Sequence, residues 1–434
     1  MTKINNYLLL LLAFFITTSV FMSDVIVMLF FVSWIASGNF KEKLKRIFLN
    51  PITSSIIIFI SYFLLSFLWS DASIFNTTTK GQLLLILAPV LFTLSFDSSY
   101  VKGAKYIFIM GLFCNILLSI FTFINPNNLM FKDGHYDNEI FAHGFLDHFD
   151  YSIFLFFGII LIISLRLKKD YSFWWWTAGL ILVITLLNSY GRIGIMCLII
   201  FVPIIIMFFQ RSKIHYILLL IMFGSLIISY YIFPPFSQRV NTTVENIYLI
   251  KHPKSLSEKI DDDAEFLAKD TFLTKEHFLQ EILKDEKKIQ LIAQKKPEYE
   301  TSIGQRYVYT KNSLKLIQKN PIFGYGGHQF YKIYNDYFSK QEIKKIKQPH
   351  NNFIFILVEL GAVGIILMLL IFFYQIKVYF QTKKWMQLIF PLFFLFIMLF
   401  DNYFLNHNTL LFFCFFTFIK YSDQHSRFNN DRLS

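Results

Sequence analysis

The chain has few of the residues from which soluble catalytic or metal-binding sites are built. Only 16% of its 434 residues are charged, and only three are cysteines. Cys114, Cys197 and Cys414 lie inside apolar segments, where a thiol behaves as a small hydrophobic group. The sequence therefore predicts neither a disulfide nor a metal cluster. A helical His-Glu-x-x-His pattern is missing, and the glycine-rich run at 323–327 lacks the Lys-Ser/Thr of a phosphate-binding loop, which disfavours zinc and nucleotide sites.

Hydrophobic residues are abundant instead. They make up 55% of the chain, and 54 residues are phenylalanine, far outside the composition of a soluble domain. Because a span needs about 20 apolar residues, the sequence predicts an all-α polytopic membrane protein with about 12 transmembrane helices. The first carries one Lys and no small-residue cleavage site, so we expect it to be retained. The predicted spans are 7–22, 24–37, 52–69, 81–96, 106–124, 149–165, 172–188, 193–209, 214–233, 352–374, 385–402 and 409–420.

The net charge of +12 reflects membrane orientation rather than nucleic-acid binding, because the basic residues alternate between connections. One set of short connections is rich in Lys and Arg, and the opposite set holds only Lys80, Lys132 and Arg192. By the positive-inside rule, both termini lie in the cytoplasm and the long loop lies outside. The rich set is Lys41, Lys43, Lys45, Arg46; Lys102, Lys105; Arg166, Lys168, Lys169; Arg211, Lys213; Lys377, Lys383, Lys384; and Lys420, Arg427, Arg432.

One long polar segment interrupts the spans and divides the chain into three parts. Residues 1–233 hold spans one to nine, residues 234–351 form a large outer loop, and residues 352–434 hold the last three spans and a short tail. Within the loop, charged residues 254–300 carry apolar residues at near-helical spacing, which predicts one or two amphipathic helices. A further helix is predicted over 303–319. No internal repeat is evident.

Three adjacent carboxylates, Asp261, Asp262 and Asp263, admit two interpretations. They resemble the metal-binding carboxylates of nucleotide-sugar transferases. They also suit the first turn of a solvated helix, where the helix dipole favours negative charge. We favour the helix interpretation, so no metal or other cofactor is predicted.

Several polar residues are predicted to face the same outer compartment. Ionisable groups at membrane depth are costly unless they line a cavity or meet a charged ligand, so a shared outer cavity is the economical interpretation. These residues are His143, His148, Arg192, Arg306, His350, Asp401 and His407.

Arg192 and Arg306 are candidates for binding a diphosphate. Arg192 lies in Asn188-Ser-Tyr-Gly-Arg-Ile-Gly194, between two spans with almost no loop, and Arg306 opens the helix after the charged insertion. A guanidinium binds phosphate oxygens through two parallel hydrogen bonds and keeps its charge. The structural alternatives are a snorkelling interfacial Arg for Arg192 and a solvated helix-face Arg for Arg306.

His350 is the candidate general base. It precedes Asn351 and an apolar run, so it is predicted at the first turn of a helix that re-enters the membrane. Neutral imidazole can remove a proton from an attacking hydroxyl near physiological pH; the alternative is an ordinary interfacial His. Gly324 and Gly326 are predicted to form a tight turn that returns the Arg306 helix toward His350.

About 60 residues carry a resemblance to a known family. Arg306-Tyr-Val-Tyr is followed by Asn320-Pro-Ile-Phe-Gly-Tyr-Gly-Gly-His-Gln-Phe330 and then by Pro349-His-Asn-Asn-Phe-Ile-Phe-Ile-Leu-Val-Glu-Leu-Gly-Ala-Val-Gly364. This order resembles the signature of the bacterial O-antigen ligase and O-antigen polymerase superfamily, with its domain at about 185–370. Gly-Arg-Ile-Gly around Arg192 is similar to the family's Ser-Arg-Gly-like motif, with the Ser displaced.

The resemblance implies a membrane glycosyltransferase of type C (GT-C) architecture in the bacterial inner membrane, with a periplasmic active site. Its donor would be a glycan linked to undecaprenyl diphosphate, and its acceptor a sugar hydroxyl of lipid A-core. Transfer would need no metal and would invert the anomeric centre. Arg192 and Arg306 would hold the diphosphate, and His350 would act as general base. Supporting roles would fall to Asn351, Gly324, Gly326, His143, His148 and Asp401.

Other activities remain open. An O-antigen polymerase joins lipid-linked repeats and shares the signature, but polymerases often have two sizeable outer loops where this chain has one. A protein O-oligosaccharyltransferase usually adds a large C-terminal domain, for which the segment after residue 420 is too short. A lipid or glycan transporter would be expected to show broken spans and charges on both sides of the midplane. Glycan, linkage and oligomeric state are not predicted.

Overall fold

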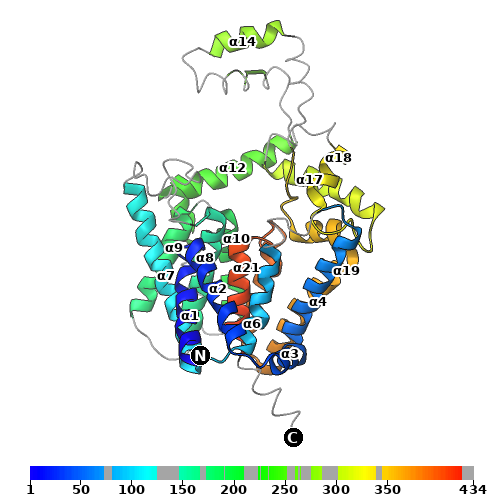
Figure 1. Cartoon of the computed structure of the whole chain (residues 1–434). Coiled ribbons are helices and arrows are strands. Elements are labelled where there is room, and N and C mark those ends of the chain that lie inside the picture. Colours follow the sequence, from blue (N-terminus) through cyan, green and yellow to red (C-terminus); the bar gives the residue numbers. More distant parts are fainter. Residues whose placement is uncertain are drawn as a thin grey trace. The chain divides into compact units, whose positions relative to one another are not determined.

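In the part of the chain that it describes, the computed structural model contains helices and no strands (Figure 1). It divides into two compact units, Met1–Ser237 with Ile317–Ser434 (unit 1) and Gln238–Leu316 (unit 2), which we describe separately. The described residues are 1–72, 81–124, 146–166, 173–189, 191–209, 223–224, 226–232, 234–251, 260–261, 264, 275–285, 302–338 and 345–422.

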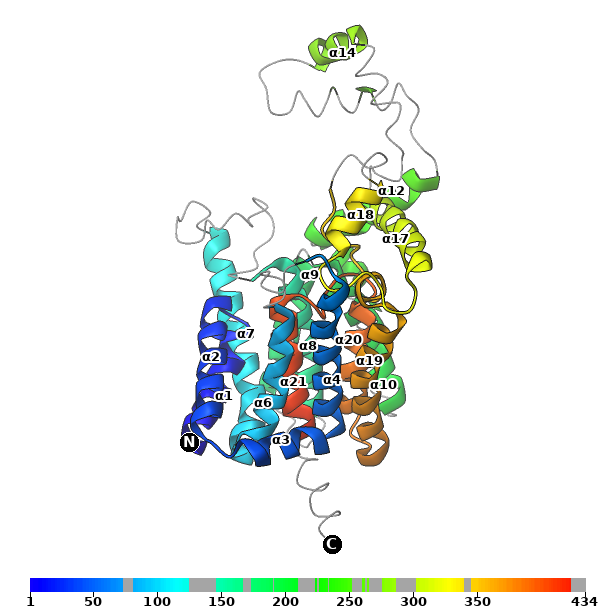
Figure 2. The ribbon, with the colours of Figure 1, turned by 45° about the vertical axis from the view of Figure 1, so that its right-hand side comes forward.

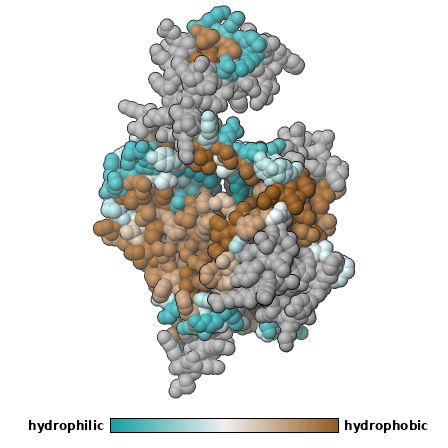
Figure 3. Space-filling view, turned by 180° about the vertical axis from the view of Figure 1, so that it is seen from behind, coloured by the Kyte–Doolittle hydropathy of each residue, from teal (hydrophilic) through white to brown (hydrophobic). Residues whose placement is uncertain are grey.

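Unit 1 is a bundle of apolar helices. In Figures 1 and 2, α4 runs beside α19 and α6 beside α21, and both pairs are in contact. On the coloured part of the face in Figure 3, hydrophobic residues form a broad band with hydrophilic residues below it. The helices are α1 (Thr2–Phe15), α2 (Val20–Ala36), α3 (Phe40–Leu49), α4 (Pro51–Leu65) with η1 (Ser66–Trp69), η2 (Leu84–Ile86), α6 (Leu87–Thr93), α7 (Ser98–Ile124), α8 (His148–Arg166), α9 (Phe173–Asn188), α10 (Arg192–Phe209), α18 (Phe330–Phe338), α19 (Asn352–Thr382), α20 (Met386–Ile397) and α21 (His407–Tyr421).

Among the described residues, three helical stretches are long and apolar enough to cross a membrane: Pro51–Trp69, Ser98–Phe121 and Asn352–Thr382. A fourth is obtained if Val20–Ala36 and Phe40–Leu49, bent by 116°, are taken together, and six shorter helices are apolar. Every predicted span except 214–233, which the described residues cover only in part, overlaps one of the helices of unit 1. The chain is a helical membrane protein, and twelve crossings remain a prediction.

Phenylalanine fills the centre of unit 1. Phe412, Phe413 and Phe416 of α21 are fully buried. The ring of Phe416 lies 4.6 Å from that of Phe157 in α8, and the ring of Phe413 lies 5.8 Å from that of Phe390 in α20. A helix that is apolar on every side is a buried helix. α21 is therefore the axis against which the surrounding helices pack.

The long helix α19 is broken at Gly361, where φ is +65° and ψ is −165°. The break frees backbone groups that must find other partners. Tyr325 N donates to Val358 O (2.9 Å), Gly326 N to Glu359 O (2.8 Å), and Ala362 N to Pro321 O (2.9 Å). The Tyr62 hydroxyl of α4 donates to Leu360 O (3.1 Å). The glycine-rich segment 321–326 therefore packs against α19 at the break and pairs its free backbone groups.

The glycines permit this crossing because the backbones are nearly in contact. A Cβ on Gly324 would lie 2.4 Å from Glu359 O, and one on Gly326 would lie 2.7 Å from Ser70 Cβ. Both glycines have positive φ, +67° and +94°. The expected turn is therefore a tight backbone crossing between η1 and α19.

In unit 2 the described elements are helices too: most of α12 (Pro234–Lys251), α14 (Lys275–Lys284) and most of α17 (Ser302–Lys319). α14 lies in the segment predicted to form amphipathic helices, and α17 matches the helix predicted over 303–319. Ile260, Ala264 and Ile282 form a small buried cluster with Leu279 against it. Asp261 forms an ion pair with Lys275 (3.5 Å), whereas Asp262 and Asp263 lie outside the described residues.

Candidate active site

His350 lies immediately before α19, in a conformation that aims its ring away from the helix. Its φ is +54°, in the left-handed region that only a minority of non-glycine residues adopt. Asn351 then returns to extended backbone and caps α19, its Oδ1 accepting a hydrogen bond from Ile354 N at 3.1 Å. His350 was predicted in the first turn of this helix and lies instead one residue before its N-cap, Asn351.

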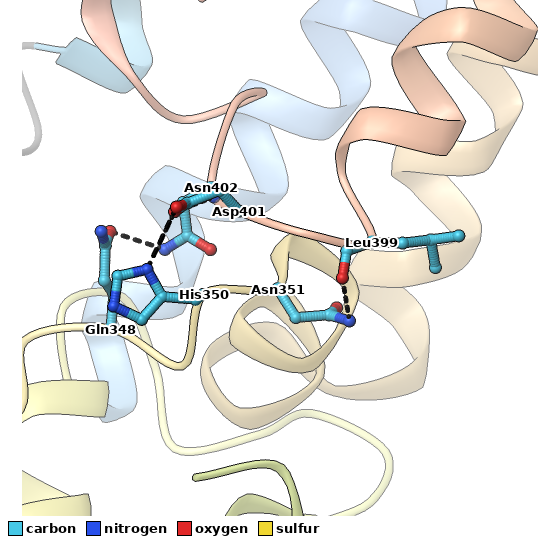
Figure 4. A network of polar contacts seen from close by, with 6 residues as sticks. All are labelled: Gln348, His350, Asn351, Leu399, Asp401 and Asn402. Atoms are coloured by element: carbon cyan, nitrogen blue, oxygen red, sulfur yellow. Dashed lines mark hydrogen bonds and ion pairs between the residues drawn. The ribbon is translucent and has the colours of Figure 1, made fainter. Parts of the chain in front are cut away.

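The imidazole of His350 is paired with the carboxylate of Asp401. His350 Nδ1 lies 3.1 Å from Asp401 Oδ2 and 3.2 Å from Oδ1 (Figure 4). A carboxylate at Nδ1 selects the tautomer that carries its proton there, which leaves the Nε2 lone pair available to accept one. The Asp401 side chain is 13% exposed and that of His350 34%, so the carboxylate is sheltered while the imidazole remains accessible.

A set of hydrogen bonds fixes the loop that carries Asp401, residues 398–406, to the start of α19. Asn351 Nδ2 donates to Leu399 O at 3.0 Å. Asn352 contributes two bonds, from its N to Met398 O (2.9 Å) and from Phe404 N to its Oδ1 (3.0 Å). Asn402 Nδ2 donates to Gln348 Oε1 at 2.9 Å, on the other side of His350 (Figure 4). The geometry of the His350–Asp401 pair is therefore preorganised.

His350 and Asp401 open into a cavity of about 1000 Å³ in unit 1. This volume is at the upper end of the range of about 300–1,000 Å³ found for small-molecule sites. Aromatic and polar side chains share its wall, a mixture that suits a polyhydroxylated ligand. It is lined by Gly81, Gln82, Asp147, Phe149, His328, Tyr331, Lys332, Lys347, Gln348, His350, Phe355, Glu359, Asp401, Asn402, Tyr403, Leu405, Asn406 and His407.

Two further carboxylates tie the far end of this loop to other helices. Asp24 of α2 accepts from His407, with 2.7 Å between His407 Nε2 and Asp24 Oδ1. Asp150 of α8 is buried and accepts from Asn406 (3.1 Å) and Asn408 (2.7 Å). His407 was expected on this side, whereas Asp24 and Asp150 escaped sequence analysis. The sequence feature that could have identified these two residues is a carboxylate near the end of an apolar span.

Glu359 and His328 form the floor of the cavity near the break in α19. Glu359 is 2% exposed, and its Oε1 accepts from Phe330 N (3.2 Å), the first amide of α18. A carboxylate at a helix N-terminus is favoured by the helix dipole. The ring of His328 packs 5.7 Å from Phe63 and 5.6 Å from Phe67, and burial lowers the pKa of His328 to about 4. It is therefore neutral at physiological pH.

Neither of the two predicted arginines is among the residues that line this cavity. Arg192 is the first residue of α10 and is half-buried, but it does not line the cavity that holds His350. Gly194 brings this first turn against α8, because a Cβ there would lie 2.4 Å from Ser152 O. Arg306 lies on α17 in unit 2 and is half-buried.

The side chains of the two histidines predicted in the third outer loop lie outside the described part of the chain. His143 lies outside the described residues, and His148 begins α8, its side chain outside the described part. Thus His350, Asn351, Asp401 and His407 meet around one loop, with Gly324 and Gly326 at the break beside Glu359.

No curated protein matches the chain. A family model described as O-antigen ligase matches residues 177–369, a range that includes Arg192, Arg306, His350 and the break in α19. That family comprises membrane glycosyltransferase-type enzymes of O-antigen and lipopolysaccharide biosynthesis, and its partners are lipid-linked glycans and lipid A-core. Residues 177–369 therefore form a domain similar to the O-antigen ligase family.

Proposed function

We propose that the protein is an O-antigen ligase of the bacterial inner membrane. It transfers O-antigen glycan from undecaprenyl diphosphate to a sugar hydroxyl of lipid A-core, on the periplasmic side and without a metal ion. The observation that carries this proposal is the His350–Asp401 pair, 3.1 Å apart, at the wall of a large polar and aromatic cavity. The pair supplies a group that such a transfer requires, a base for the acceptor hydroxyl.

The proposed reaction is a single displacement. His350 Nε2 removes the proton of the acceptor hydroxyl while that oxygen forms a bond to the anomeric carbon of the donor. The bond from this carbon to the diphosphate oxygen breaks, and the diphosphate leaves with the electron pair. Asp401, at Nδ1, stabilises the imidazolium that results, as the buried carboxylate does in a catalytic triad. One displacement inverts the anomeric centre.

The charge that develops on the leaving diphosphate needs cations. We assign this role to Arg192 and Arg306, since a guanidinium binds diphosphate oxygens in a bidentate manner. Substitution of either Arg by Ala should abolish transfer while the protein still inserts, and a chelator should not inhibit it. If transfer persists in both Ala variants, diphosphate binding must be assigned elsewhere.

The proposed orientation follows from charge. In Figure 2 the basic helix α3 lies at the lower end of unit 1, and α19 begins at the upper end, where His350 precedes it. α3 carries Lys41, Lys43, Lys45 and Arg46, so the positive-inside rule assigns the lower end to the cytoplasm. The cavity then opens to the periplasm.

An O-antigen polymerase would use the same residues on a different acceptor, namely a second lipid-linked repeat. Deleting the gene and separating lipopolysaccharide on a gel distinguishes the two activities. A ligase deletion leaves bare core while lipid-linked polymer accumulates, and a polymerase deletion leaves core capped with one repeat. Unchanged lipopolysaccharide would refute both.

Complementation with variants then tests the assigned base. Wild-type protein should restore the ladder, and His350→Ala should not, although it inserts to the same level. Lys345→Ala is a suitable control because Lys345 is exposed, lies in the same segment and does not line the cavity. Activity near the wild-type level in His350→Ala would remove His350 as the base.

A further inference from the structure

Two lysines line the cavity close to His350, one from α18 and one from the segment that follows it. They are Lys332 and Lys347. The carboxylates in the cavity wall already have partners: Asp401 pairs with His350, Glu359 accepts from Phe330 N, and Asp147 accepts from Phe149 N at 3.1 Å. Within the described part of the chain, none of these carboxylates forms a hydrogen bond or ion pair with either lysine.

Asn335 of α18 holds the segment that carries Lys347 through two hydrogen bonds to the backbone of Ile346. Asn335 Nδ2 donates to Ile346 O (2.9 Å), and Ile346 N donates to Asn335 Oδ1 (3.0 Å). Asn335 and Ile346 are both buried. The clamp turns Ile346 inward and leaves the next residue, Lys347, exposed in the cavity wall. Lys332, three residues before Asn335, lies on the same face of α18.

The two lysines differ in what they already contact. Lys332 Nζ forms an ion pair with Asp71 at 2.9 Å, which raises the pKa of Lys332 and keeps it charged. Lys347 has no hydrogen bond or ion pair with any residue in the described part of the chain. Lys347 is therefore a cation in the cavity wall whose three donors meet no described residue.

We propose that Lys347, with Lys332 in the wall of the same cavity, binds an anionic substituent of the acceptor glycan, a phosphate or a carboxylate on a sugar near the attacking hydroxyl. This proposal rests on the proposed function. In an inverting displacement the attacking oxygen and the leaving group lie on opposite faces of the anomeric carbon. His350 marks the acceptor face, and Lys347 precedes it by three residues in one clamped segment. A cation there meets the acceptor rather than the leaving diphosphate.

The test uses the full-length protein in detergent and lipid A-core acceptor in three forms: native, dephosphorylated, and with its carboxyl groups reduced. Binding without donor is measured first. Wild-type protein should bind the native form about tenfold more tightly than one of the modified forms, which equals about 1.4 kcal/mol. The form that loses affinity identifies phosphate or carboxylate as the ligand. Lys347→Ala should bind all three forms equally, and Lys347→Arg should recover most of the difference.

Lys345→Ala is the matched control, because it removes a lysine of the same segment that does not line the cavity, and it should behave as wild type. In transfer assays Lys347→Ala should raise KM for native acceptor about tenfold and leave kcat and donor KM unchanged. A rise in donor KM instead, or equal binding of the three forms by wild-type protein, would overturn the subsite. Absence of transfer by wild-type protein, with the binding difference intact, would refute the proposed function alone.

Discussion

Replacing Asp401 with Asn tests whether the His350–Asp401 pair works as a catalytic unit. The amide has nearly the same shape and can still accept a hydrogen bond from Asn402 N, which donates to Asp401 Oδ1 at 2.8 Å. The loop should therefore stay in place. The negative charge 3.1 Å from His350 Nδ1 is lost, and with it the stabilisation of the imidazolium formed during transfer.

The magnitude follows from the exposure of the pair. A hydrogen bond to a charged group contributes about 1.5–3 kcal/mol. Asp401 is largely buried but His350 is one-third exposed, so we expect a loss of about 2 kcal/mol, or about 30-fold in kcat. KM for both substrates should stay within about twofold, because neither role assigned to Asp401 involves substrate binding.

The assay is transfer of labelled glycan from purified undecaprenyl diphosphate donor to lipid A-core, with initial rates measured against each substrate. Asp401→Glu should recover part of kcat, because it restores the charge. Equal unfolding temperatures of Asp401→Asn and wild-type protein would show that the loop is intact. If kcat of Asp401→Asn is within twofold of wild type at equal stability, the pair has no catalytic role.

Three further substitutions address the structure around the site. Gly361→Ala should destabilise the protein by about 3 kcal/mol or more, because φ of +65° with ψ of −165° suits only glycine and the new Cβ would lie 2.2 Å from Ile322 O. Unfolding in detergent measures this loss of stability, and an unchanged stability would contradict the break in α19. Asn352→Ala removes the acceptor of Phe404 N and should lower both stability, by about 1 kcal/mol, and kcat. The pKa of His328 is about 4 in the folded protein against an ordinary value of 6.5, so the unfolded chain binds a proton more readily. The free energy of unfolding should therefore be fully retained above pH 6.5 and should fall as the pH falls toward 4. His328→Asn, which tolerates φ of +59°, should flatten that dependence in unfolding curves recorded at pH 7, 5.5 and 4, and an unchanged slope would exclude His328 as its source.

Local patterns in the sequence predicted much of the fold. Apolar runs predicted the helices of unit 1, and the stretch between Tyr299 and Pro321 predicted α17. Both predictions succeeded because they depend on residues that are close together in the sequence. His350 beside the start of α19 and Asp401 on the same side followed from sorting polar residues by loop. These inferences need only sequence order and the alternation of sides.

Contacts between distant segments were not predictable in the same way. The pairing of His407 with Asp24 joins residues 383 positions apart, and no spacing rule links them. Gly324 and Gly326 suggested a turn, and their small size also admits the backbone of α19 beside Gly324 and the end of η1 beside Gly326. A glycine shows that space is tight without showing what occupies it. Likewise, nothing in the sequence linked Asp150 to Asn406 and Asn408, which lie 256 and 258 positions further along the chain.

The break in α19 has a consequence for how the protein assembles. Its partners come from segments made at very different times: Tyr62 precedes Leu360 by 298 residues, and the 321–326 segment lies just upstream. An isolated apolar segment enters a bilayer most easily as a continuous helix, since every backbone group is then paired. We therefore expect α19 to insert straight and to break only when α4 and the glycine-rich segment dock on it. His350, the proposed base, would then reach its working position only after this docking, so that chains in which it has not occurred would not carry out the proposed transfer.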